Sequence, residues 1–156
     1  NQYGKKLSES DKAAQKFYDN YTKTKQLPNK DLLQARLAID GGYYKEALEN
    51  IKDINESTLS SNLDKADFNF RKGKIYQNIG DTDQAISSFE RSIAFAQSLD
   101  THFGASSSLQ LGYIYQKKKD SKKALSWFEK ALSYKKHEYK NSVDNKAQAA
   151  ITDINN

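Results

Sequence analysis

The feature that most constrains the fold of this chain is an internal repeat. Residues 70–93 read FRKGKIYQNIGDTDQAISSFERSI and residues 109–132 read LQLGYIYQKKKDSKKALSWFEKAL, so the two segments align without a gap, Gly73 with Gly112, 39 residues apart (70 to 109). A third copy, residues 32–54, lies 38 residues before the first of these (32 to 70). A repeat of this length is typical of chains built by stacking one small helical or strand unit many times.

The spacing of small and large residues within each copy predicts two antiparallel helices. Residues three or four places apart share one face of a helix, so each copy carries two apolar stripes. Small residues on these stripes allow two helices to approach closely, and large residues fill the space between one hairpin and the next. The small positions are Ala35, Gly73 and Gly112 on the first helices and Ala47, Ala85 and Ala124 on the second; the large ones are Tyr76, Tyr115, Phe89 and Phe128.

These patterns predict an all-α fold in which residues 1–156 form a single domain of stacked antiparallel hairpins. Asp81 and Asp120 stand where helix N-caps are expected, and Ser142 is the predicted N-cap of the last helix. The predicted parts are an N-terminal half-repeat helix over 9–26, repeat 1 over 28–54, repeat 2 over 63–98, repeat 3 over 104–136 and a C-terminal capping helix over 142–155.

Composition supports a helical array and argues against several other classes. The hydrophobic fraction is 37%, the mean hydropathy is −0.92 and there is one proline, which suits thin stacked layers of uninterrupted helices. The absence of cysteine excludes disulfides and thiolate metal sites, and no apolar run approaches the roughly 18 residues of a membrane span. The net charge is +5, but nearly all basic residues are lysine, whereas recognition of phosphates and bases favours arginine; nucleic-acid binding is therefore disfavoured.

The order of G-x-x-Y, then Gly-Asp, then A-x-x-x-F-x-x-A/S resembles the tetratricopeptide repeat over roughly residues 10–155. The resemblance implies an α-solenoid of hairpins with a right-handed superhelix. Three departures stand out: Asn69 and Ser108 occupy the place of an aromatic residue, the helix-terminal proline is missing, and the period exceeds the usual length of about 34 residues. The segments ARLAIDGGYYKEAL and HEYKNSVDNKAQAAI further resemble the C-terminal part of Bacteroidetes tetratricopeptide proteins of unassigned function, which implies export of the parent protein.

No group of residues in the sequence predicts catalysis, a cofactor or a metal ion. His102 and His137 have no second ligand at helical spacing and are predicted to be surface residues. Gly41 and Gly42 follow a predicted helix and are sufficiently explained as its end. A run of lysines is predicted to be a solvated hairpin turn, with an anionic surface as the alternative contact: Lys117, Lys118, Lys119, Lys122 and Lys123.

The resemblance implies that the first helices of the hairpins line a concave groove that binds extended or helical peptides. The implied groove positions are Leu32, Arg36, Ile39, Asp40, Phe70, Lys74, Gln77, Asn78, Leu109, Tyr113, Gln116 and Lys117. The apolar members are expected to be exposed, so that alanine at Phe70 and Arg36 would remove partner binding without lowering the melting temperature. The carboxylate clamp of this family requires Lys, Asn and Arg at such places, and apolar residues occupy half of them, so recognition of acidic C-terminal peptides is not supported.

The sequence therefore predicts a non-enzymatic scaffold for a protein or peptide, with no small-molecule substrate, forming part of a longer protein. The alternative is a sensor or regulatory segment of a larger regulator. The groove could instead be filled by a neighbouring helix or by further repeats. The half-repeat helix over 9–26 carries Phe17, Tyr18 and Tyr21, and we expect upstream residues, or self-association through this helix, to cover its apolar stripe.

Overall fold

The computed structural model describes Lys12 and residues 30–156. Where the sequence analysis predicts one domain, the chain divides into two compact units, residues 1–55 and 56–156. In the first unit, α2 (Lys30–Asp40) and α3 (Tyr44–Ile51) form a hairpin. Apart from Lys12, the predicted half-repeat helix over 9–26, and with it the expected self-association, lies outside the described residues.

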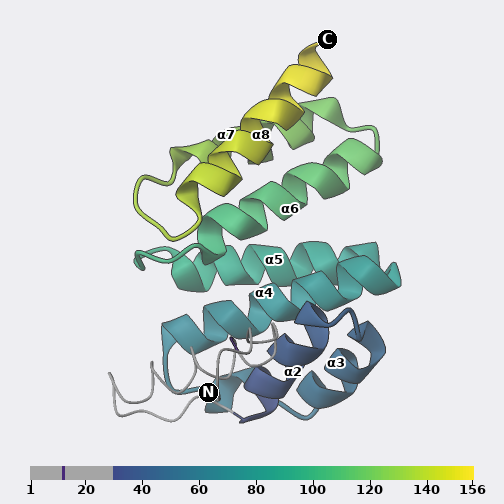
Figure 1. Ribbon diagram of the computed structural model, residues 1–156, viewed down its shortest axis with the longest axis vertical. Helices are drawn as coiled ribbons and strands as arrows, with labels where there is room; N and C mark the ends of the chain where they lie inside the picture. The colour runs from purple at the N-terminus through teal and green to yellow at the C-terminus, as the bar shows by residue number, and fades with distance from the viewer. Residues whose placement is uncertain (1–11, 13–29) are drawn as a thin grey trace, which may run out of the picture. The chain divides into compact units, whose positions relative to one another are not determined.

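The second unit is a stack of five helices in which each helix packs on the next. They are α4 (Asn62–Ile79), α5 (Thr82–Ala96), α6 (Phe103–Lys117), α7 (Ser121–Ser133) and α8 (Lys140–Asn155), preceded by a single 3-10 turn, Glu56–Thr58 (Figure 1). The first four helices form two antiparallel hairpins, and α8 packs on α7 and α6. The part of the chain that the structure describes contains no strand. The predicted all-α stack of helical hairpins is confirmed.

The three hairpin turns close in the same way, with one residue in the left-handed backbone region after the first helix. This residue is Gly42 (φ +81°), Gly80 (φ +90°) or Lys119 (φ +64°). The backbone amide of the following residue then donates a hydrogen bond to the carbonyl five residues earlier. This carbonyl is one of those that lack a donor at the C-terminal end of a helix. These bonds are Tyr43 N to Ala38 O at 2.7 Å, Asp81 N to Tyr76 O at 2.9 Å and Asp120 N to Tyr115 O at 2.9 Å.

Lys119 is the one residue of the three that is not glycine. The left-handed backbone region costs a residue with a Cβ roughly 1–2 kcal/mol. Glycine avoids this cost but loses more backbone entropy on folding. We therefore expect Lys119→Gly to raise the free energy of unfolding by about 0.5–1 kcal/mol, measured by urea denaturation. Lys118→Gly is the matched control, because Lys118 has φ −77° and should gain nothing. Equal effects of the two substitutions would contradict this explanation.

The predicted caps of the second helices are confirmed. A carboxylate oxygen of Asp81 accepts from Gln84 N at 3.3 Å, and one of Asp120 accepts from Lys123 N at 3.1 Å. An aspartate here also places negative charge at the positive end of the helix dipole. Each hairpin turn of the second unit therefore ends one helix and starts the next within a few residues.

The predicted cap of α8 is wrong. The helix begins at Lys140, two residues before Ser142, and the preceding residue Tyr139 has φ +65° and makes no capping bond through its side chain. The amide of Val143 already donates to Tyr139 O at 2.9 Å, so the first helical turn is formed before Ser142 is reached.

The predicted close approach of the two helices of a hairpin is confirmed. A Cβ added at Gly73 would lie 2.7 Å from Cδ1 of Phe89, and one added at Gly112 would overlap the Phe128 ring even more. Both phenylalanines are fully buried. Each phenylalanine ring therefore contacts the glycine of its own hairpin. The sequence had indicated only that these rings fill the space between one hairpin and the next.

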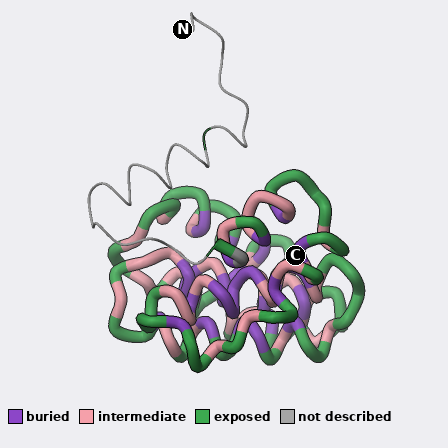
Figure 2. Tube along the Cα trace, turned by 90° about the horizontal axis from the view of Figure 1, so that it is seen from below, coloured by how far each residue is buried: buried purple, intermediate pink, exposed green. Residues whose placement is uncertain are grey.

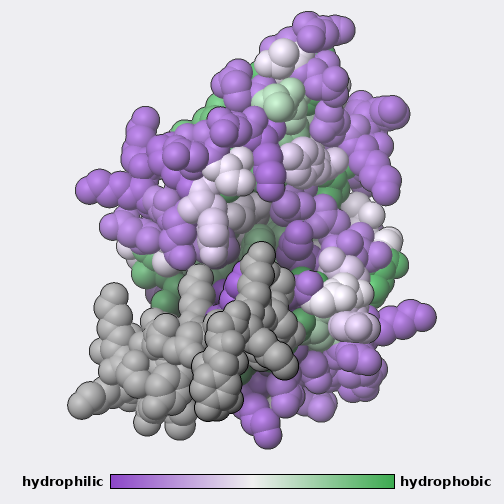
Figure 3. Space-filling view, viewed as in Figure 1, coloured by the Kyte–Doolittle hydropathy of each residue, from purple (hydrophilic) through white to green (hydrophobic). Residues whose placement is uncertain are grey.

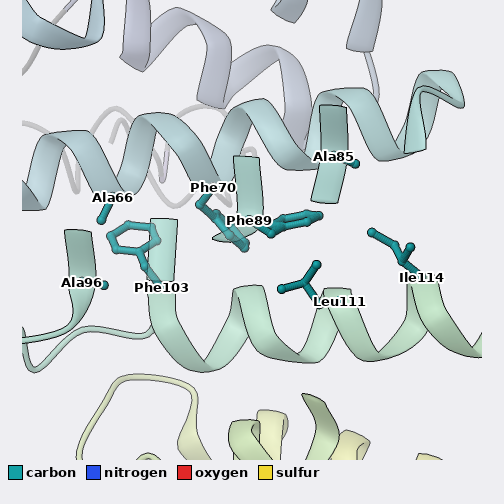
Figure 4. Close-up of a cluster of buried hydrophobic side chains, with 8 residues drawn as sticks. All are labelled: Ala66, Phe70, Ala85, Phe89, Ala96, Phe103, Leu111 and Ile114. Atoms are coloured by element: carbon teal, nitrogen blue, oxygen red, sulfur yellow. The ribbon is translucent and has the colours of Figure 1, made fainter. Parts of the chain in front are cut away.

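Two buried clusters join successive helices of the second unit. In the first, Phe70 of α4 lies with its ring centroid 6.0 Å from that of Phe89 and 5.6 Å from that of Phe103 (Figure 4). The second joins α6, α7 and α8 around Leu109 and Val143. Buried residues recur along the inner sides of the helices (Figure 2). Because each cluster draws on successive helices, each of the two hairpins of the second unit depends on the helix packed beside it for a complete core. The first cluster consists of Ala66, Phe70, Ala85, Phe89, Ala96, Phe103, Leu111 and Ile114.

The two residues that replace the expected aromatic are buried and hydrogen-bonded within their own helices. Nδ2 of Asn69 donates to Lys65 O at 2.9 Å, and Oγ of Ser108 donates to Gly104 O at 2.8 Å. Each bond reaches the carbonyl four residues back, as short polar side chains commonly do in helices. The substitution of polar for aromatic residues therefore leaves these two buried groups paired.

Asn69 has a second function at the start of the unit. Its amide also donates to Glu56 Oε2 at 2.7 Å, and Arg91 Nε of α5 donates to the same oxygen at 3.2 Å. Burial alone would raise the pKa of Glu56, but the hydrogen bonds from Arg91 and Asn69 outweigh it and lower the pKa. The ionised carboxylate of Glu56 thus links the turn before α4 to α4 and α5 through hydrogen bonds.

Candidate functional site

The predicted groove positions fall in both units, and the two sets are considered separately. In the first unit, Leu32 and Ile39 are buried, Arg36 is half-buried and Asp40 is exposed. The other eight lie at helical spacing along α4 and α6, where they share a face of each helix. They are Phe70, Lys74, Gln77 and Asn78 on α4 and Leu109, Tyr113, Gln116 and Lys117 on α6.

The expectation that the apolar groove residues are exposed is wrong. Leu32, Phe70 and Leu109 expose only 5%, 7% and 4% of their surface. Phe70 and Leu109 each belong to one of the two buried clusters, so their side chains are already covered by this chain. These residues stabilise the stack, and Phe70 is unsuitable as a probe of partner binding that should leave the melting temperature unchanged.

The polar groove positions on α4 and α6 remain accessible. Lys74, Gln77, Tyr113 and Gln116 are half-buried, whereas Asn78 and Lys117 are exposed. Nδ2 of Asn78 donates to Lys74 O at 2.8 Å, and Nε2 of Gln116 donates to Oδ2 of Asp153 in α8 at 3.3 Å. The surface that α4 and α6 can offer a partner is therefore mostly polar.

Tyr113 occupies a fixed position on this face. Its ring meets the Phe128 ring edge-on, with centroids 5.4 Å apart and an interplanar angle of 70°. Burial raises the pKa of Tyr113 above its ordinary value, which already lies well above neutral pH, and the protonated phenol can donate a hydrogen bond.

A pocket of about 420 Å³ brings together three predicted groove residues, Gln77, Tyr113 and Lys117. It lies between the α4–α5 turn and the C-terminal half of α6, and its volume is within the range of ligand pockets, roughly 300–1,000 Å³. The sequence analysis missed the remaining lining residues because they come from the turn, from α5 and from other faces of α6. They are Gly80, Thr82, Ala85, Ile114 and Lys118.

Comparison with protein families identifies the repeats. A family model described as tetratricopeptide repeat matches residues 64–137, which contain nearly all of α4 and all of α5, α6 and α7. Residues 64–137 of the chain are tetratricopeptide repeats. A search of curated proteins and a search of solved structures each found no match. Tetratricopeptide repeats generally mediate protein–protein interaction, and the family is typically non-catalytic.

His102, within the matched tetratricopeptide repeats, is less exposed than the sequence predicts. Its ring lies between Phe103, with centroids 4.2 Å apart, and Tyr139, with centroids 5.0 Å apart, and meets Phe70 edge-on at 5.7 Å. Its Nδ1 is 3.0 Å from Oγ of Ser106. The histidine therefore helps pack the α5–α6 connection against the α7–α8 connection.

The lysine run at the α6–α7 turn of the tetratricopeptide repeats is exposed, as predicted. Lys123 is not only solvated, since its Nζ lies 5.2 Å from the centroid of the Tyr115 ring. The visible face over α6, α7 and α8 is mostly hydrophilic (Figure 3).

Among the described helices none is long and apolar enough to cross a membrane, and the same residues contain no group of three potential metal ligands.

Proposed function

We propose that this protein is a non-enzymatic scaffold that binds a protein or peptide segment along the α4 and α6 helices of its tetratricopeptide repeats. The observation that carries the proposal is the pocket, because it joins Gln77 of one repeat to Tyr113 and Lys117 of the next. A site formed by two consecutive repeats suits a segment that runs across the helices, and a single isolated hairpin could not form it.

The chemistry of the pocket suits a peptide. Ala85 and Ile114 are buried and supply apolar surface, while Gln77 and Tyr113 are half-buried and offer hydrogen bonds to a peptide backbone or side chain. Half-buried tyrosines that are already held by their own protein lose little conformational entropy on binding and are common in the centres of interfaces. Tyr113, held against Phe128, is such a residue.

A peptide-display selection on the full chain tests the proposal. Gln77→Trp places a larger, uncharged side chain at the pocket and is expected to weaken the selected peptides about tenfold or more, the equivalent of about 1.4 kcal/mol. Ser126→Trp is the matched control, because it adds the same side chain at an exposed position on α7, outside the pocket. Thermal denaturation followed by circular dichroism checks that both variants fold. Failure to select any peptide above background, or an equal loss in both variants, would exclude this face as the binding site.

A further inference from the structure

The lining of the pocket favours a negatively charged group. It contains two lysines, Lys117 and Lys118, and no carboxylate. Within the described part of the chain neither lysine forms an ion pair, and both are exposed. Gln77, Thr82 and Tyr113 add neutral hydrogen-bond donors beside them. An anion entering the pocket would therefore meet two positive charges and three hydrogen-bond donors, beside the apolar side chains of Ala85 and Ile114.

The next repeat shows a carboxylate at the corresponding position. Gln116 follows Gln77 by 39 residues (77 to 116), the offset of the repeat. Nε2 of Gln116 donates to a carboxylate oxygen of Asp153, which the following helix α8 supplies. Gln77 has no such bond: its side chain forms no hydrogen bond within residues 30–156. Of two glutamines at equivalent repeat positions, Gln116 therefore donates a hydrogen bond to a carboxylate of this chain, whereas the side-chain amide of Gln77 has no partner within residues 30–156.

We propose that the pocket binds the carboxylate of an aspartate or glutamate side chain in the partner segment, with Lys117 and Lys118 supplying charge and Gln77 a hydrogen bond. This inference rests on the proposed function and specifies one residue of the partner. Lys117 and Lys118 also lie at the C-terminal end of α6, where positive charge is stabilised by the helix dipole. The arrangement differs from the Lys, Asn and Arg clamp, whose positions in this chain are partly apolar and buried.

The experiment combines changes in the peptide and in the protein. The probes are the selected peptides, each synthesised with its aspartate or glutamate replaced by asparagine or glutamine. With the wild-type chain we expect the neutral peptide to bind about tenfold more weakly, because a charge-assisted hydrogen bond is lost. With Lys117→Gln/Lys118→Gln the same peptide change should matter less than about twofold, since the partner charges are gone.

Lys122→Gln/Lys136→Gln is the matched control, because it removes two exposed charges outside the pocket. It should keep the tenfold difference between acidic and neutral peptides. Selected peptides that lack acidic residues, or an unchanged difference in the Lys117→Gln/Lys118→Gln protein, would overturn the carboxylate proposal and leave the scaffold standing. Failure to select any peptide would overturn both. Displacement of the acidic peptide by inorganic phosphate at matched ionic strength, but not by N-acetylglutamate, would show a phosphate site instead.

Discussion

Replacing Gly112 with leucine is expected to destabilise the second unit by at least about 3 kcal/mol, at the upper end of the range for overpacked cores. The reason is that even a Cβ at this position would overlap the fully buried Phe128 ring, and a leucine adds three further carbons. Helix propensity works in the opposite direction, since glycine is the weaker helix former by up to about 1 kcal/mol. Chemical denaturation followed by far-ultraviolet circular dichroism measures the loss.

A smaller pair of changes separates steric overlap from other causes. Gly112→Ala should also destabilise the protein, although alanine is the better helix former. Combining it with Phe128→Leu should cost less than the sum of the two single changes, because the shorter side chain leaves room for the added methyl group. A leucine variant that denatures at the wild-type midpoint would show that Gly112 is not at the tight contact.

Replacing Phe70 with alanine is expected to lower the free energy of unfolding by about 3–5 kcal/mol, the usual cost of removing a buried aromatic ring. The ring contacts Phe89 and Phe103, so its loss opens a cavity between two hairpins. Leu63→Ala, on the same helix, is the control: Leu63 is 44% exposed and should cost less than about 1 kcal/mol.

Thermal and urea denaturation of both variants provides the measurement. An unchanged melting temperature in Phe70→Ala would contradict the placement of Phe70 in the core and restore it as a surface residue for binding. The expected large loss instead means that weakened binding by this variant could reflect unfolding. Variants at Gln77, Lys117 and Lys118 are better suited, because these side chains are half-buried or exposed.

The repeat made the fold predictable, because the patterns that indicate helices, close contacts and caps lie within a short stretch of sequence. Helical spacing identifies which residues share a face, a glycine on such a face indicates a close approach of two helices, and an aspartate after a turn indicates a cap. Gly112 and Asp120 follow this logic in the structure, whereas the contact of Phe128 with Gly112 was not predicted. The left-handed conformation of Lys119 could have been inferred too, since the aligned residue 39 positions earlier (119 to 80) is Gly80.

The site was only partly predictable, because one helix does not reveal what lies beside it. The spacing put Phe70 and Leu109 on the same faces as Gln77 and Tyr113, but their burial depends on side chains from other helices. The pocket likewise depends on Thr82 and Ala85 of α5, which no groove position on a first helix could indicate. Residues that line a site from two or more elements come together only in the folded chain.

Trp127, the only tryptophan of the chain, lies on α7 and packs against the cluster formed by α4, α5 and α6. Its fluorescence therefore reports on the junction between the two hairpins, whereas circular dichroism reports on all helices together. In a stack stabilised by neighbour contacts, the junction can open before the helices melt. The separation of the two optical transitions along a denaturant series would thus measure how strongly one repeat is coupled to the next, with no label introduced.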